Sequence, residues 1–276
     1  MKVLFASLAT LFFSFAGKAG NYSPLNDSSR IVRTVTIEKC TEVLEANVVF
    51  PELLQDHEEA SLDYIEKFAS NRRDYLIRMY NKSKKYFSRI NLIFKRYNIP
   101  KEFCVLIALE SAFNANAVSS AGAVGYWQFM EEVAKEYGLR TLPISDLKKP
   151  ATRAVKGKAA PVDDRKNFIK STHAAGRYLK DRSRNLNNDC LLIAASYNWG
   201  VGNVWNSLQR TGKRDANFWD IKKYLPAETR SYVMNFIAMN VIFHNYDKFL
   251  KKELRFRDQV ITVPDPSEST AMLQTR

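Results

Sequence analysis

Residues 108–130 read ALESAFNANAVSSAGAVGYWQFM, and this stretch decides how the rest of the chain is interpreted. It continues an apolar run from Phe103 to Leu109, which predicts a buried helix because apolar residues occur on every side of it. Glu110 stands in the last turn of that helix, where burial and the negative end of the helix dipole both disfavour the carboxylate anion. We therefore predict a raised pKa for Glu110 and a role as a general acid. Taken alone, a solvent-facing glutamate at a helix end would fit as well.

Small and amide-bearing residues follow the helix. Gly122 and Gly125 permit a close backbone approach or a positive φ. Gln128 offers an amide that both donates and accepts hydrogen bonds. The hydroxyls of Ser111 and Ser119 could orient the acid or contact a ligand, and their alternative role is to cap the loop. The stretch therefore suits an acid that works beside a hydroxyl-rich ligand.

The chain of 276 residues carries a formal net charge of +13, which suits an anionic polymer or surface. Residues 1–19 combine a positive start, an apolar run and small residues, which predicts a secretory signal peptide. Its removal takes away Lys2 and Lys18, so the net charge falls to +11. Nucleic acid is another partner of basic proteins, but predicted export and the lack of a binding motif argue against it. No cysteine precedes Cys40, so we expect no lipoprotein attachment site.

The three cysteines are an odd number, so at least one thiol stays unpaired. Cys104 and Cys190 lie in apolar helical runs and are predicted to be buried core residues, with a disulfide between them as the alternative. The cysteine spacings fit no zinc site, and the three histidines are isolated. We therefore expect neither a metal nor another cofactor.

The remaining chain reads as mainly helical. Residues 51–113 have helical periodicity, and residues 72–101 carry ten Lys or Arg against one Asp, which indicates a solvated face or a track for a polyanion. Residues 140–168 contain prolines and lysines and are predicted to form an exposed loop. Short extended segments are expected at Ile31–Ile37 and Gln259–Val263. Further helices are predicted at 100–112, 169–184, 189–198, 202–210 and 228–248.

Four motifs occur in order along this pattern. The first is Glu110-Ser111, and the second lies in residues 122–130. Residues 196–200 read SYNWG, and residues 228–233 read ETRSYV. Together they resemble the motifs of bacterial lytic transglycosylases that carry the soluble-lytic-transglycosylase (SLT), goose-lysozyme-like domain.

The likeness extends over about residues 55–250. The helical run before Pro100 and the segment 171–179 (STHAAGRYL) are similar to the membrane-bound D-type branch of that family. The sequence departs from the family pattern at Glu131-Glu132, where a small, proline-bearing pair is usual, and in a longer, more basic stretch at 141–162.

The resemblance implies an all-α fold, with a lysozyme-like SLT helical domain, an N-terminal helical extension and a short extended C-terminal tail. The divisions that we predict are a signal peptide (1–19), an N-terminal arm (20–54), a catalytic domain (55–250, motif core 98–245) and a C-terminal tail (251–276).

The resemblance also implies roles for single residues. Glu110 would be the catalytic acid and base. Trp127 is at least as well explained by packing in the core as by contact with sugar, and for Trp199 packing is the favoured role. The residues implied to contact substrate are Ser111, Ser119, Gln128, Met130, Tyr197, Asn198, Glu228 and Tyr232.

The implied reaction cleaves the bond between N-acetylmuramic acid and N-acetylglucosamine without water and leaves a 1,6-anhydro end. The substrate's N-acetyl group would replace the second carboxylate of ordinary glycosidases. Two alternatives stay open. The first is a hydrolytic lysozyme in which Glu131, Glu132 or Glu228 supplies that carboxylate, and the second is a non-catalytic peptidoglycan-binding scaffold. The expected partners are periplasmic glycan strands and other cell-envelope machinery, with peripheral envelope contact once the signal peptide is cleaved.

Overall fold

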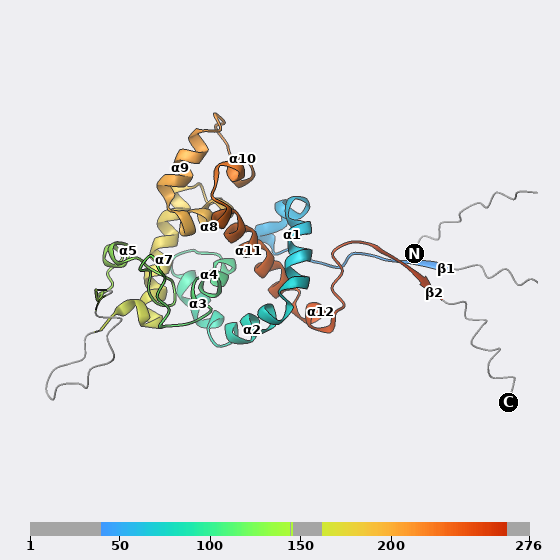
Figure 1. Ribbon diagram of the computed structural model, residues 1–276, viewed down its shortest axis with the longest axis horizontal. Coiled ribbons are helices and arrows are strands. Elements are labelled where there is room, and N and C mark those ends of the chain that lie inside the picture. Colours follow the sequence, from blue (N-terminus) through green and yellow to red (C-terminus); the bar gives the residue numbers. More distant parts are fainter. Residues whose placement is uncertain (1–39, 144, 146–161, 264–276) are drawn as a thin grey trace, which may run out of the picture. The chain divides into compact units, whose positions relative to one another are not determined.

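The computed structural model describes residues 40–143, 145 and 162–263 (Figure 1). One compact unit runs from Thr41 to Ile261 and contains every predicted site residue. The second unit comprises residues 1–40 and 262–276, most of which lie outside the described ranges. The predicted signal peptide and the extended segment Ile31–Ile37 therefore also lie outside the described residues.

Short elements make up the first half of the compact unit. In chain order they are β1 (Cys40–Leu44), the 3-10 helix η1 (Glu52–His57), α1 (Glu58–Asn71), α2 (Arg73–Ser83), α3 (Phe87–Lys95), η2 (Lys101–Val105), α4 (Leu106–Ser111) and α5 (Glu131–Glu136).

Longer helices dominate the second half. They follow as η3 (Asp164–Lys166), α7 (Phe168–Asn185), α8 (Cys190–Trp199), α9 (Val201–Gln209), α10 (Phe218–Ile221), η4 (Lys222–Tyr224), α11 (Ala227–His244) and α12 (Tyr246–Lys251). The strand β2 (Gln259–Val263) pairs with β1 in a two-stranded sheet.

Helix α11 is the centre of the core. Its residues from Phe236 to Ile242 are all buried, because this part of the helix is apolar on nearly every side. Figure 1 shows α11 running between α8 and α1, and its main packing partners are these two helices, with α4 and η2 beside them. The short helix α4, which carries Glu110, is therefore held against the helix at the centre of the core.

Side-chain caps fix where the helices around the site begin. The side chain of Asn167 accepts a hydrogen bond from the backbone N–H of Lys170 at the start of α7. Asp189 accepts two such bonds at the start of α8. These caps satisfy N–H groups that have no partner inside the helix. Gly200, at φ 84°, separates α8 from α9, because this left-handed backbone is open to glycine at little cost.

The all-α prediction is confirmed. The predicted helices at 169–184, 189–198 and 202–210 correspond to α7, α8 and α9 within a residue or two, and the strand at 259–263 is β2. The helix predicted at 100–112 is instead the 3-10 helix η2 followed by α4. The helix predicted at 228–248 ends at His244, and α12 continues after Asn245. The short helices α5 and α10 were not predicted.

The prediction of an exposed loop over 140–168 is wrong for residues 163–165, whereas Arg140, Val162 and Asn167 are exposed as predicted. Asp163, Asp164 and Arg165 are buried, and Arg165 is completely inaccessible to solvent. Residues 144 and 146–161, the larger part of the predicted basic insertion, lie outside the described ranges.

Cys104 and Cys190 are buried, as predicted, and both are free thiols, so the alternative of a disulfide between them is wrong. Among the described helices, none combines the length and the apolar character that crossing a bilayer requires.

Candidate active site

Glu110 lies one residue before the end of α4, and its side chain is partly buried. The hydroxyl of Tyr232, on α11, donates a hydrogen bond of 2.6 Å to Oε1 of Glu110. The two residues are 122 positions apart in sequence, and they meet because α4 packs on α11. Two of the four sequence motifs are therefore joined by one short hydrogen bond.

Burial raises the pKa of Glu110 from its ordinary value of 4.5 to about 7. The hydrogen bond from Tyr232 opposes this shift because it stabilises the carboxylate, and the negative charge of Glu228 adds to it. A carboxyl group with a pKa near 7 is half protonated at neutral pH. It can therefore donate a proton and afterwards accept one.

Tyrosines surround the carboxyl group of Glu110. The rings of Tyr178 and Tyr197 meet edge to face, with centroids 5.3 Å apart. Burial, followed by the charge of Glu110, raises the pKa of both Tyr197 and Tyr232 well above the ordinary value. These phenols stay neutral, so they can donate hydrogen bonds beside Glu110 without competing with it as acids. The sequence analysis did not single out Tyr178, although it falls in the segment 171–179.

The backbone after Glu110 is strained. Ala112, Phe113 and Gln128 all have a positive φ, between 48° and 66°. A left-handed backbone costs non-glycine residues on the order of 1–3 kcal/mol, and such residues gather at functional sites. The turn at Ala112 and Phe113 ends α4 directly after the acid. It therefore leaves Glu110 at the rim of the helix rather than within it.

Ser111 joins the end of α4 to the loop that carries the second motif. Its hydroxyl donates to the backbone oxygen of Tyr126 at 2.8 Å, and it accepts from the backbone N–H of Asn114 at 3.2 Å. Ser119 accepts a hydrogen bond from the backbone N–H of Ala123 at 2.9 Å. Both hydroxyls thus make the loop contacts that the sequence analysis gave as their alternative role, and substrate contact stays a prediction.

Gln128 folds back onto its own loop. Its amide nitrogen donates to the backbone oxygens of Gly125 at 2.8 Å and Ala117 at 3.2 Å. Met130 ends this loop just before α5, with 39% of its surface exposed. The hydroxyl of Tyr197 donates to the backbone oxygen of Trp127 at 2.9 Å, so the third motif is tied to the second. Trp127 itself is fully buried.

The third and fourth motifs also meet. Asn198, at the end of α8, accepts a hydrogen bond of 2.8 Å from the hydroxyl of Thr229 on α11. Glu228 directly precedes Thr229 and is exposed. Its negative charge contributes to the raised pKa of Glu110. The other two candidates for a second carboxylate differ from it. Glu131 pairs with Lys135 at 2.7 Å on α5, and Glu132 is exposed on the same short helix.

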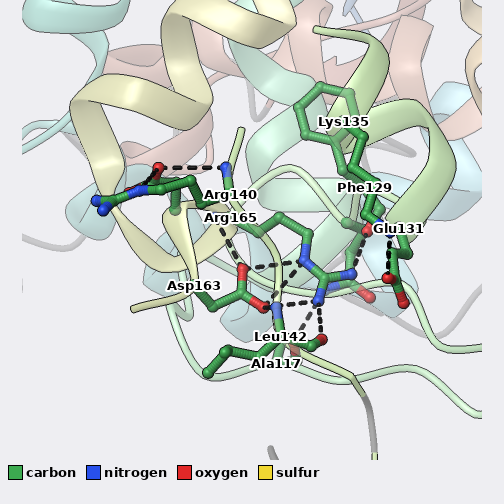
Figure 2. A network of polar contacts seen from close by, with 10 residues as sticks. Ala117, Phe129, Glu131, Lys135, Arg140, Leu142, Asp163 and Arg165 are labelled. Carbon is green, nitrogen blue, oxygen red and sulfur yellow. Dashed lines mark hydrogen bonds and ion pairs between the residues drawn. The ribbon is translucent and has the colours of Figure 1, made fainter. Parts of the chain in front are cut away.

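A buried ion pair holds the loop of the second motif from behind (Figure 2). The Arg165 guanidinium contacts the Asp163 carboxylate with a shortest distance of 2.6 Å, and both side chains are almost inaccessible to solvent. Arg165 also donates to the backbone oxygens of Phe129 and Leu142. Although burial alone favours the neutral acid, hydrogen bonds from Arg165 and from two backbone N–H groups hold the pKa of Asp163 below its usual range.

The same segment explains Gly125. A Cβ atom at this position would overlap the backbone carbonyl of Arg165, and the backbone there has a φ of 82°. Only glycine lets the loop approach the Arg165 segment this closely. Gly125 in turn supplies the carbonyl that orients the Gln128 amide. Arg165 therefore fixes the loop through its side chain and through its backbone.

Sequence reasoning missed Asp163 and Arg165. Both stand in a charged run beside prolines and lysines, where solvent exposure is the usual outcome. The one signal available was their i, i+2 spacing of opposite charges just before the predicted helix at 169. Within the described ranges, no three His, Cys, Asp or Glu side chains lie close enough together to hold a metal ion.

Residues 90–219 match the family model of the transglycosylase SLT domain. Residues 90–219 therefore resemble a transglycosylase SLT domain, and the mainly helical fold is the one expected for such a domain. The chain is also similar in sequence to a curated protein of the D-type branch, the membrane-bound lytic murein transglycosylase D of Escherichia coli strain K12. The two are 29% identical over 157 residues, which are 56% of this chain and 30% of the relative.

Two other proteins are similar over comparable lengths. A putative soluble lytic murein transglycosylase of Haemophilus influenzae is 31% identical over 176 residues, 62% of this chain and 26% of its own. The solved structure of an inactive mutant of the lytic transglycosylase Slt from Pseudomonas aeruginosa is 21% identical, with a TM-score of 0.44 over 64% of this chain and 26% of that one. This chain spans less than a third of the length of these curated relatives.

Proposed function

We propose that this protein is a peptidoglycan lytic transglycosylase that uses Glu110 first as acid and then as base. The observation that carries the proposal is the protonatable Glu110 carboxyl at the end of α4, hydrogen-bonded to a neutral Tyr232. The likeness of residues 90–219 to the SLT domain and the names of the relatives support the same reaction class.

In the proposed mechanism, Glu110 gives its proton to the oxygen between N-acetylmuramic acid and N-acetylglucosamine. The bond from that oxygen to C1 of the muramic acid breaks, and the muramic N-acetyl group stabilises the positive centre at C1. Glu110, now a carboxylate, takes the proton of the C6 hydroxyl while O6 bonds to C1. The products are a 1,6-anhydro end and a free hydroxyl, so no water is consumed.

The proposed substrate contacts come from the two sides of Glu110. On one side, the loop of the second motif would present Ser119, Gln128 and Met130, with Ser111 fixing the loop to α4. On the other side, Tyr197 and Asn198 from α8 and Glu228 and Tyr232 from α11 would line the glycan strand. The loop's attachment to Arg165 and its strained backbone support a rigid binding surface.

The predicted cellular location is part of this proposal. The signal peptide at residues 1–19 would direct export to the periplasm, where glycan strands are the substrate. The net charge of the mature chain suits the carboxylates that peptidoglycan carries.

Digestion of purified sacculi followed by mass spectrometry of the fragments tests the reaction. We expect muropeptides with anhydro ends, which are one water lighter than reducing ends. Reducing ends would instead support hydrolysis with Glu228 as the second carboxylate, an alternative favoured by its electrostatic reach to Glu110. Binding to sacculi without any soluble product would support the scaffold alternative.

The Tyr232→Phe variant is expected to move the basic limb of the pH–rate profile upward. In the wild-type enzyme, kcat should fall above about pH 7 as Glu110 loses its proton. The Tyr232 hydroxyl stabilises the Glu110 carboxylate, so its removal raises the pKa of Glu110 further. The profile of kcat on soluble glycan strands from pH 5 to pH 9 measures this shift. A limb that stays in place or moves downward would contradict the assigned hydrogen bond.

A further inference from the structure

A hollow lies between α1, the start of α2 and α11, next to residues of the candidate site. Its volume is about 550 Å³, and we call it the α1 pocket. Leu109 forms part of its wall. The side chains that give it its chemistry are Tyr64, Lys67, Arg72, Tyr75, Ser231 and Asn235.

Two helices connect the wall of the α1 pocket to the residues of the candidate site. Leu109 directly precedes Glu110 on α4, and Ser231 directly precedes Tyr232 on α11. Tyr232 and Glu110 are hydrogen-bonded to each other. Neighbouring residues on a helix point about 100° apart, so the pocket wall adjoins the carboxyl group without being part of its immediate contacts. A group that branches from a ligand at Glu110 can therefore reach the pocket.

Cationic and phenolic groups converge in the α1 pocket. Arg72, Tyr64 and Tyr75 all line the pocket, and the positive charge of Arg72 opposes the effect of burial on the pKa of both tyrosines. Among the contacts of the described residues, the side chains of Lys67 and Arg72 make no ion pair. The acids of α1 next to Lys67 are engaged elsewhere, since Asp63 and Glu66 both pair with Arg257.

One neutral contact orients the pocket's amide. The Tyr64 hydroxyl donates to the side-chain oxygen of Asn235 at 2.7 Å, which fixes that amide so that its nitrogen remains a donor. The pocket thus offers two cations, an amide donor and aromatic rings. This combination suits a carboxylate on a flexible, partly apolar chain, because carboxylates form their strongest hydrogen bonds with cationic donors.

We propose that the α1 pocket binds the carboxylate-bearing peptide branch of the glycan whose backbone lies at Glu110. The inference rests on the proposed function, since peptidoglycan carries its peptides on the muramic acid next to the bond that is cut. Lys67 and Arg72 bind the peptide carboxylates, and the phenolic rings of Tyr64 and Tyr75 pack against its apolar parts. The enzyme accordingly favours strands that still carry peptides.

The double variant Lys67→Gln/Arg72→Gln tests the pocket. Initial rates are compared on peptide-bearing glycan strands and on strands stripped of peptide by an amidase. We expect KM to rise about tenfold on peptide-bearing strands, the loss expected when charge-assisted hydrogen bonds are removed, with kcat retained. On stripped strands the variant should behave as the control does.

The control is Arg89→Gln/Lys95→Gln, which removes the same charge from exposed positions on α3, outside the pocket. It separates a general loss of positive charge from a loss at the site. Equal weakening of both double variants, or a change in KM that is the same on both substrates, would overturn the proposal.

Direct binding separates this inference from the proposed function. A soluble stem tetrapeptide is titrated into the full chain, into the pocket variant and into the control by calorimetry. Binding by the full chain and the control but not by the pocket variant would support the pocket even if the protein cut no glycan. Equal affinity for all three proteins, or no binding to any of them, would reject the pocket whatever the catalytic result.

Discussion

Glu110→Gln is expected to abolish the release of soluble fragments from peptidoglycan sacculi, with a loss in rate of at least ~10²–10⁴-fold. Glutamine keeps the shape of the side chain and can still accept the hydrogen bond from Tyr232. It has no acidic proton to give to the glycosidic oxygen and no carboxylate to accept one later. Turbidity of sacculi and chromatography of the soluble products measure the loss.

The same variant should stay folded, and the pH dependence of its stability gives an independent check. The pKa of Glu110 is raised from 4.5 to about 7 in the folded state, so the folded protein holds this proton more tightly than the unfolded chain does. The contribution of Glu110 to the free energy of unfolding is therefore fully present below about pH 4.5 and is lost as the pH rises to about 7. The glutamine variant lacks this loss and should be at least as stable as wild type at pH 8.

Glu59→Gln is the matched control, because Glu59 is exposed in the first turn of α1. It should retain normal lysis. Normal turnover by Glu110→Gln would refute the assignment of the acid. If the variant lost both its activity and its cooperative unfolding transition, Glu110 would be needed for folding rather than for the reaction.

The raised pKa of Glu110 could be predicted from the sequence because it depends on local pattern. An apolar run that ends in one glutamate predicts both the burial and the raised pKa of Glu110. The helices α7, α8 and α9 could be placed because polar caps and a glycine mark their ends. The break between η2 and α4 could not be predicted, since the residues at this junction, Val105 and Leu106, are neither proline nor glycine.

The buried ion pair that holds the loop of the second motif could not be predicted either. A pair such as Asp163 and Arg165 gives no periodic signal, and its burial depends on the distant residues Phe129 and Leu142 reaching the same place. Tertiary contacts of this kind override the usual preference of charged residues for the surface. The sequence pattern therefore predicted the buried carboxyl group of Glu110 but missed the residues that hold its neighbouring loop.

Arg165→Met is expected to lower the free energy of unfolding by ~3–5 kcal/mol, because it leaves the buried Asp163 carboxylate without its cation. Such a loss is a large share of the ~5–15 kcal/mol that stabilises a typical domain. Urea denaturation at pH 7 measures it. The lysis rate should fall as well, since the loop that carries Gln128 and Met130 loses its attachment at Phe129.

Arg140→Met provides a matched comparison, since it also removes an arginine that forms an ion pair with an aspartate, Asp164. The Arg140 side chain is 66% exposed, and Asp164 has a second cationic partner, Lys170, at 2.8 Å. Because the buried Asp164 carboxylate keeps Lys170 as a cationic partner, this variant should lose much less stability than Arg165→Met and should unfold at a higher urea concentration. Equal midpoints for the two variants would show that the buried pair does not hold the loop.

Lowering the pH should reduce the difference in free energy of unfolding between the wild type and Arg165→Met. The pKa of Asp163 lies below its ordinary value in the folded protein, so its ionised form stabilises the fold above the unfolded-state pKa, and this contribution is lost as the pH falls through the folded-state pKa. In the variant, the cation that lowers this pKa is gone, and protonation relieves the unpaired charge. A stability difference that is large at pH 7 and shrinks toward pH 3 would identify the Asp163 charge, rather than lost packing, as the cause.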